Sequence, residues 1–184
     1  LLEKEPARFR LPPLGLPPST ALYSPLILIG PGTGISTFLS FTQYLLEYKL
    51  KHPEDDRFAS VKRMVFFGCR NQDKDYIYRD ELESLLREGI ITDLFVAQST
   101  VEGSPKYVQD CLKEHAQEVM SLLRSSDEHL SRLFVCGDAK GMSKGVLECL
   151  TQMAQETGGI TIEEARKWLM ELKKSDRYVE DVWS

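Results

Sequence analysis

The stretch "LILIGPGTGISTF", residues 26 to 38, decides the fold. Its first four residues, Leu26 to Ile29, are all apolar and predict a strand that is buried on both faces. A glycine-rich turn follows at residues 30 to 34, and an amphipathic pattern from Ile35 to Leu50 then predicts a helix. A strand that passes through such a turn into a helix can bind a phosphate, and it is also a common structural turn.

The composition and charge exclude several classes of partner. The 184 residues are 42% hydrophobic and 28% charged, which is ordinary for one globular domain. The net charge of -5 argues against a surface for nucleic acid or for an anionic membrane. No apolar run approaches the roughly 20 residues of a membrane helix, and no signal peptide is visible. We therefore expect no nucleic-acid or membrane partner and a cytoplasmic location.

Cysteine and histidine spacing gives no sign of a metal site. The four cysteines lack the spacing of metal ligands, so free thiols in a reducing compartment are expected rather than a disulfide. The three histidines, His52, His115 and His129, suggest neither a catalytic triad nor a metal site. The chain also lacks an initiator methionine, and we expect it to be part of a longer protein.

Two regions differ in composition. Residues 1–24 are rich in proline, which favours an extended connector, and residues 25–184 are predicted to form one domain. Within the domain, three further strands are predicted at Val61–Phe67, Asp93–Ala97 and Leu133–Cys136. Helical patterns separate the strands: Tyr78 to Leu86 with Gly89 at its end, Ser104–Pro105 through Leu122, Met142 to Met153, and a last helix that begins with the capping box Thr161 and Glu164.

This alternation predicts an α/β fold: an open, mostly parallel Rossmann-like sheet with helices on both faces. In such sheets ligands bind beyond the carboxyl ends of the strands. The segments that follow the predicted strands should therefore meet at one edge. They are "GPGTG" (30–34), "GCRNQD" (68–73), "QST" (98–100) and "CGDAKGM" (136–142).

Taken alone, "GPGTGI" is a weak signal. It is neither the G-x-G-x-x-G dinucleotide fingerprint nor a P-loop, because its third glycine comes too early and no lysine follows. It is either a structural turn or a backbone approach to a pyrophosphate at the N-terminus of the following helix. The second predicted strand leads into Arg70 rather than an acidic residue, which favours a 2′-phosphate and hence NADP over NAD.

Five motifs together resemble one family. "GPGTGI", "FFGCRNQDKDYIYRDEL", "KYVQD", "VCGDAKGM" and "DVWS" occur in the order and at the spacing of the diflavin reductases. From about residue 24 to 184 the chain resembles their NADPH-binding lobe, the C-terminal domain of the ferredoxin-NADP-reductase-type module. The resemblance implies hydride transfer from NADPH to FAD on an upstream lobe, with electrons passing through FMN to a partner protein. The motifs are most similar to the branch that reactivates the cobalamin of methionine synthase, which would be that partner.

The resemblance also implies the residues of the site. The pyrophosphate and nicotinamide side would be lined by Gly32, Thr33 and Gly34. The adenosine and its 2′-phosphate would be contacted by Arg70, Ser99, Lys106, Tyr107 and Gln109. The nicotinamide end would be formed by Cys136, Asp138 and Met142, with Asp181 and Trp183 from the C-terminus.

Three of these residues would act on the reaction. Asp181 would stabilise the positive charge that develops on the nicotinamide ring during hydride transfer. Cys136 would pack against that ring, and Trp183 would cover the flavin and move aside. The alternative is that Cys136 is a buried core residue and Trp183 a packing anchor.

One position departs from the family pattern. Relatives generally place an arginine after the serine of "QST", where this chain has Thr100. A charge-assisted hydrogen bond contributes about 1.5–3 kcal/mol, so its loss would weaken NADPH binding by roughly 10- to 150-fold. We expect a preference for NADPH that is weaker than in relatives, with partial compensation by Arg70 and Lys106. Two alternatives stay open: a diflavin reductase with another haem or iron–sulfur acceptor, and a nucleotide-binding docking module without catalysis.

Overall fold

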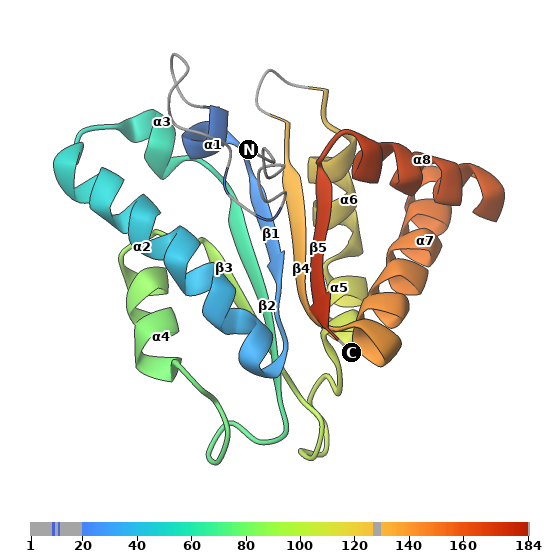
Figure 1. The fold of residues 1–184 in the computed structure, drawn as a ribbon, viewed down its shortest axis with the longest axis horizontal. Coiled ribbons are helices and arrows are strands. Elements are labelled where there is room, and N and C mark those ends of the chain that lie inside the picture. The colour runs from blue at the N-terminus through green and yellow to red at the C-terminus, as the bar shows by residue number, and fades with distance from the viewer. Residues whose placement is uncertain (1–8, 10, 12–19, 127–129, 184) are drawn as a thin grey trace, which may run out of the picture.

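The computed structural model describes residues 9, 11, 20–126 and 130–183. One parallel sheet of five strands forms its centre, in the order β3-β2-β1-β4-β5 (Figure 1). The strands are β1 (Leu26–Ile29), β2 (Arg63–Cys69), β3 (Asp93–Gln98), β4 (Arg132–Asp138) and β5 (Tyr178–Trp183). The predicted α/β fold is confirmed, and every neighbouring pair of strands is parallel.

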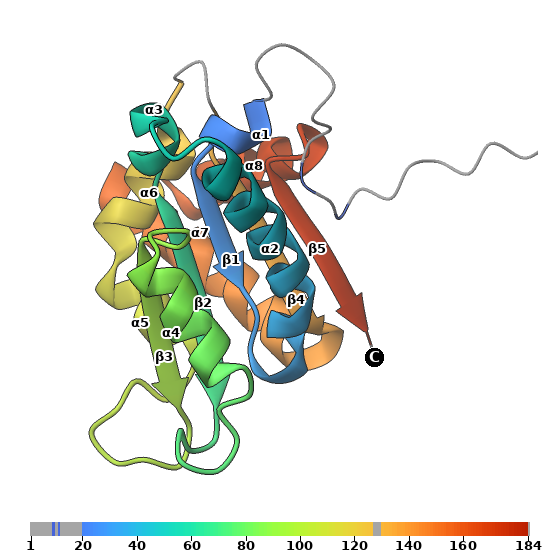
Figure 2. The same ribbon diagram turned by 90° about the vertical axis from the view of Figure 1, so that its left-hand side faces the viewer.

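Helices cover both faces of this sheet. Figure 1 shows α2, α3 and α4 on one side and α5 to α8 on the other, and Figure 2 shows β1, β3 and β5 running in the same direction. The helices are α1 (Thr20–Tyr23), α2 (Ile35–Lys51), α3 (Asp56–Ala59), α4 (Arg79–Arg87), α5 (Val108–Glu114), α6 (Ala116–Arg124), α7 (Lys144–Gly158) and α8 (Ile162–Lys174). A short 3₁₀ turn, η1 (Gly32–Gly34), and a short π-helix, η2 (Ala139–Ser143), precede α2 and α7.

Strand β1 separates two hydrophobic cores. Ile27 and Ile29 belong to the core under α5 to α8, whereas Leu26 and Leu28 belong to the core under α2 and α4. All four side chains have no accessible surface. The prediction of a strand buried on both faces is therefore confirmed, and the alternation of a strand's side chains explains the division.

Several helix boundaries also follow the sequence. Helix α2 begins at Ile35 as predicted, and the left-handed Gly89 (φ 65°) lies just beyond α4. Helix α8 starts with the predicted capping box, in which Thr161 and Glu164 each accept a hydrogen bond from the other's backbone. These local signals need only neighbouring residues to work, which is why the sequence predicts them.

The helix that was expected to start at Ser104–Pro105 does not. The Pro105 carbonyl instead accepts from Gln98 N at 2.7 Å, and the helix begins at Val108 after the N-cap Tyr107. The expected single helix is also divided at His115 into α5 and α6. The His115 ring packs against the ring of Phe95 of β3, with centroids 3.9 Å apart and the planes tilted by 32°, so a tertiary contact accompanies the break.

The C-terminal tail forms a fifth strand, which the sequence analysis did not predict. Strand β5 pairs in parallel with β4 and forms one edge of the sheet. The helix predicted from Met142 starts as the π-helix η2, which contains Met142, and continues directly as α7. The predicted connector, residues 1–24, lies mostly outside the described residues, and its boundary stays a prediction. Across the described ranges, no helix combines the length and apolarity needed to cross a bilayer.

Candidate functional site

The loops that follow β1, β2, β3 and β4 meet at the carboxyl edge of the sheet, as predicted. They enclose a cavity of about 590 Å³, which we term the edge pocket. Its walls come from the glycine turn, both loops beside β2 and β3, the start of α5, and η2. The lining residues are Pro31, Gly32, Gly68, Cys69, Arg70, Asp75, Ser99, Lys106, Tyr107, Val108, Gln109, Gly141 and Met142.

The glycine turn packs directly on the neighbouring strands. A Cβ atom at Gly34 would lie 2.1 Å from the carbonyl oxygen of Cys136 on β4, so no side chain fits there. A Cβ atom at Gly68 would lie 3.1 Å from Pro31 Cβ, which is a close approach of β2 to the same turn. Gly32 has a φ of 57° and open space around it, so its conformation rather than its size favours glycine. The turn therefore presents backbone to the pocket.

The turn leads into α2 without a side-chain cap. Gly34 is the N-cap residue and supplies no side-chain hydrogen bond to the first turn of the helix. Ser36 Oγ donates to Thr33 O at 2.7 Å, and Thr37 Oγ1 lies 3.3 Å from Cys136 Sγ. A helix N-terminus of this kind favours anions, because its first N–H groups carry partial positive charge.

Basic side chains also line the edge pocket. Arg70 and Lys106 are both exposed, and they lie on the loops after β2 and β3. Tyr107, 55% exposed, lies beside Lys106, whose Nζ is 5.7 Å from the ring centroid. Ser99 and Gln109 line the same pocket. Two cations, an aromatic face and polar donors in one concave site suit a phosphorylated nucleotide.

The π-helix η2 is anchored at both ends. The Asp138 carboxylate accepts a hydrogen bond from Gly141 N at 2.6 Å, which caps η2. At the other end, Ser143 Oγ donates to Glu180 of β5 at 3.0 Å. A Cβ atom at Gly137 would lie 2.4 Å from Met142 Cε, so Met142 packs closely over the end of β4. Short π-helices are frequent at functional sites.

Strands β4 and β5 carry a second group, which we term the tail edge: Cys136, Asp181 and Trp183. The register pairs Cys136 with Asp181 and Asp138 with Trp183. Cys136 is fully buried, whereas Asp181 is exposed and Trp183 is 47% exposed. Burial raises the pKa of the Cys136 thiol, the hydrogen bond with Thr37 opposes that rise, and the Asp181 carboxylate adds to it. The thiol is therefore neutral at physiological pH.

The structure groups the predicted site residues into two sets. Those that line the edge pocket are Gly32, Arg70, Ser99, Lys106, Tyr107, Gln109 and Met142. Those that lie at its margin or on the tail edge are Thr33, Gly34, Cys136, Asp138, Asp181 and Trp183. Sequence reasoning missed Asp75, which lies beyond the loop segment it had singled out. The sequence feature that could have identified Asp75 is its place at the end of a polar turn, where aspartate carboxylates often accept hydrogen bonds from backbone N–H groups.

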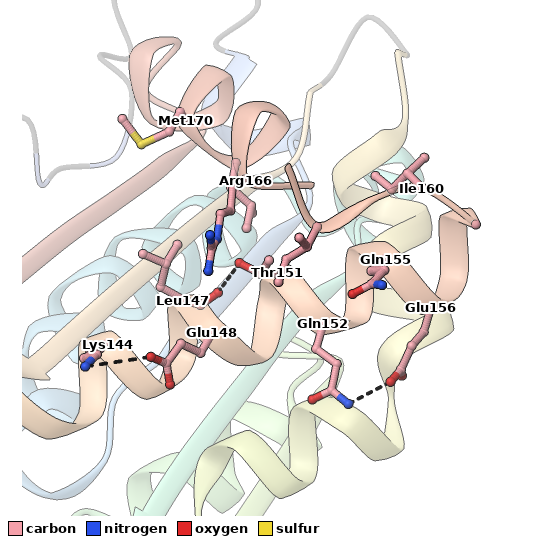
Figure 3. Close-up of a pocket in the computed structure, with 13 residues that line it drawn as sticks. Lys144, Leu147, Glu148, Thr151, Gln152, Gln155, Glu156, Ile160, Arg166 and Met170 are labelled. Carbon is pink, nitrogen blue, oxygen red and sulfur yellow. Dashed lines mark hydrogen bonds and ion pairs between the residues drawn. The ribbon is translucent and has the colours of Figure 1, made fainter. Parts of the chain in front are cut away.

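A larger cavity, of about 1010 Å³, lies in the groove between α7 and α8 (Figure 3). Its polar groups pair along α7: Gln152 with Glu156 at 2.7 Å, and Lys144 with Glu148 at 3.9 Å. None of the predicted site residues lines it. Throughout the described part of the chain, no cluster of three His, Cys, Asp or Glu side chains could hold a metal ion. The edge pocket is therefore the candidate site.

Comparison with known proteins identifies the family of the chain. Residues 28–148 match the oxidoreductase NAD-binding domain family. The chain is 49% identical over 183 residues to methionine synthase reductase of Caenorhabditis elegans, covering 100% of this chain and 26% of that protein. It is 40% identical over 166 residues to the human methionine synthase reductase, covering 87% of this chain and 23% of that protein. It is 34% identical over 181 residues to NADPH–cytochrome P450 reductase of Dictyostelium discoideum, covering 98% of this chain and 26% of that protein.

These relatives confirm the resemblance that the five motifs predict. The chain spans about a quarter of the length of the curated relatives it matches, at 26% and 23% of the first two. The chain belongs to the oxidoreductase NAD-binding domain family.

Proposed function

We propose that this oxidoreductase NAD-binding domain binds NADPH in the edge pocket and delivers its hydride to FAD on a preceding lobe of a longer protein. Electrons would then pass through FMN to a partner protein. The observation that carries this proposal is the edge pocket itself, in which residues from the loops after β1 to β4 line one cavity of about 590 Å³. The family of the chain supports it independently.

The residues of the edge pocket fit a phosphorylated dinucleotide. A side chain at Gly34 would collide with Cys136 O, so the turn has only backbone atoms at this position. A pyrophosphate could approach that backbone closely. Arg70 would contact the adenosine end, where an arginine favours a 2′-phosphate. Lys106, with Ser99 and Tyr107, would surround that phosphate, and Gln109 would flank the adenine. These assignments are the ones that the family resemblance implies.

The tail edge would serve the reaction. When bound, NADPH supplies a hydride that FAD accepts. Asp181 would place a negative charge beside the ring that becomes positive, which favours the transition state over the ground state. Cys136 is neutral, fully buried and close to Thr37 Oγ1, so it would have to be uncovered before it could give the ring a small polarisable contact without adding charge. Trp183, half-exposed at the end of an edge strand, would cover the reacting face and leave it during turnover.

Methionine synthase is the proposed electron acceptor. Relatives that match along the chain are named methionine synthase reductase, and the Caenorhabditis elegans protein is 49% identical. NADPH–cytochrome P450 reductases also match, at 34% identity in Dictyostelium discoideum, so a haem acceptor is the second candidate. A cytoplasmic location stays a prediction.

Flavin reduction in the full-length protein tests the proposal. The protein containing this chain and its flavin lobes would be mixed anaerobically with NADPH or NADH, and bleaching of flavin absorbance followed by stopped flow. We expect rapid bleaching with NADPH and slower bleaching with NADH. The reduced protein would then be offered methionine synthase with inactive cobalamin, or a cytochrome P450, and reactivation or haem reduction measured. Absence of bleaching with either nucleotide would contradict hydride delivery, and reduction of the P450 alone would favour the haem acceptor.

A further inference from the structure

The backbone of Arg70 is hydrogen-bonded on both sides by side chains from two different loops. Its N–H donates to Asp75 Oδ2 at 3.0 Å. Its carbonyl oxygen accepts from Thr100 N at 3.0 Å and from Thr100 Oγ1 at 2.7 Å. Loops are usually the mobile part of a fold, whereas here both the N–H and the carbonyl of the exposed Arg70 are hydrogen-bonded.

The Asp75 carboxylate organises the loop after β2. The second carboxylate oxygen, Oδ1, accepts from Asn71 N at 2.7 Å. The backbone N–H of Asp75 donates to Asn71 O at 3.0 Å. The N–H groups of Asn71 and Arg70 lower the pKa of the Asp75 carboxyl, so it is ionised at neutral pH. Because its oxygens point at backbone N–H groups, its charge is partly neutralised before any anion enters the pocket.

Further hydrogen bonds join the loops after β2 and β3. Ser99 N donates to Cys69 O at 3.0 Å, and Gln72 N donates to Gln98 Oε1 at 3.1 Å. The loop that carries Arg70 and the loop that carries Ser99 and Lys106 therefore form one connected wall of the edge pocket.

We propose that Asp75 and Thr100 are positioning residues that fix the Arg70 backbone and thereby set the preference of the edge pocket for a 2′-phosphorylated nucleotide. This inference rests on the proposed function. Ordering a mobile loop on binding costs free energy, and a loop whose backbone is already fixed around Arg70 avoids that cost. Thr100, where the family resemblance leads one to expect an arginine, thus contributes through Arg70 rather than through a charge of its own.

Calorimetric titration of the full 184-residue chain with NADP⁺ and with NAD⁺ tests the inference. Asp75→Asn keeps the shape but leaves an amide group facing a backbone N–H, and we expect NADP⁺ affinity to fall about tenfold. Thr100→Val removes one neutral hydrogen bond, and we expect a fall of about threefold. Affinity for NAD⁺ should stay within about twofold in both variants, because NAD⁺ lacks the 2′-phosphate that Arg70 would bind.

Asp73→Asn is the matched control. It removes the same charge from the same loop, but Asp73 is exposed and does not line the edge pocket. We expect its ratio of NADP⁺ to NAD⁺ affinity to equal that of the wild-type chain. Thermal unfolding of each variant would verify that it is folded. We expect Thr100→Val to disturb the fold least, because Thr100 is exposed.

A double-mutant cycle with Arg70→Gln decides whether the two residues act through Arg70. We expect that neither Asp75→Asn nor Thr100→Val lowers NADP⁺ affinity further once Arg70 is replaced. Equal losses for NADP⁺ and NAD⁺, or a full further loss in the Arg70→Gln background, would overturn the inference. A wild-type chain that binds neither nucleotide would instead refute the proposed function, on which the inference rests.

Discussion

The edge pocket and the tail edge lie at the same end of the sheet but are built differently. The edge pocket is formed by loops whose backbones are fixed by side chains such as Asp75 and Thr100. The tail edge is positioned by strand pairing, which sets Cys136 beside Asp181. The first is concave and partly basic, whereas the second ends in an exposed carboxylate and a half-exposed tryptophan. We therefore expect the edge pocket to determine the affinity for NADP⁺ and the tail edge to determine the rate of flavin reduction by NADPH.

Gly34→Ala would affect both regions and should have the largest effect. Its Cβ atom would lie 2.1 Å from the Cys136 carbonyl oxygen, a backbone atom that cannot move without disturbing β4. We expect the free energy of unfolding to fall by about 3 kcal/mol, measured by urea denaturation, and nucleotide binding to be lost. Gly32→Ala is the control, because only its φ of 57° opposes a side chain, and a loss of about 1 kcal/mol is expected. Equal losses would contradict the packing argument.

Arg70→Gln should affect the edge pocket alone. Loss of a charge-assisted hydrogen bond to a phosphate should weaken NADP⁺ binding by roughly 10- to 150-fold, measured by calorimetry. The free energy of unfolding should not change, because Arg70 is exposed. Lys74→Gln removes the same charge from an exposed position of the same loop that does not line the edge pocket, and it should bind normally. Comparable weakening in both variants would indicate a general electrostatic effect.

Asp181→Asn should affect the tail edge alone, and it should change the rate of the reaction rather than the affinity for the nucleotide. We expect the rate of flavin reduction by NADPH in the full-length protein to fall about tenfold, since about 1.4 kcal/mol of transition-state stabilisation corresponds to that factor. NADP⁺ affinity should stay unchanged, because Asp181 does not line the edge pocket. A large loss of affinity with an unchanged rate would remove the division between the two regions.

Glu180→Gln should have the smallest effect, on the support of the tail edge. Burial tends to raise the pKa of Glu180, but hydrogen bonds from Lys173, Tyr178 and Ser143 outweigh it, and the pKa lies below the ordinary 4.5. A lowered pKa means that ionised Glu180 stabilises the fold above pH 4.5 and that this contribution disappears as the pH falls through the lowered value. We expect the variant to lose about 1 kcal/mol at pH 7.

The pH dependence supplies the check on that last prediction. Urea denaturation of both proteins from pH 7 to pH 3 should give curves that converge as the pH falls. Glu171→Gln, an exposed substitution on α8, should match the wild-type chain throughout. A difference for Glu180→Gln that persists at low pH would show that the carboxylate charge is not its cause.

The sequence predicted what depends on local pattern. The buried strand β1, the start of α2 and the capping box of α8 each need only neighbouring residues. The division of the predicted helix at His115 could not be predicted in this way, because the His115 ring packs against a ring from β3. Neither could the fifth strand, whose pairing partner lies some 45 residues earlier in the chain, as for Tyr178 and Leu133.

In the candidate site, too, some residues could be predicted from the sequence and others depend on contacts between distant segments. The family resemblance supplied most residues of the edge pocket, because its motifs lie directly after strands that the alternation already placed side by side. Asp75 and Thr100 were not recognised as positioning residues, because their hydrogen bonds to Arg70 join two loops in space. Such side chain to backbone contacts have no periodicity that a sequence pattern could reveal.

The most direct test of the central claim is an NMR titration of the ¹⁵N-labelled chain with NADP⁺. The account predicts that the amide signals that shift most belong to the edge pocket, among them those of Gly32, Arg70, Ser99, Gln109 and Met142. The signals of the groove between α7 and α8, such as those of Gln152 and Met170, should stay in place. Shifts confined to that groove, or no shifts at saturating NADP⁺, would contradict the account.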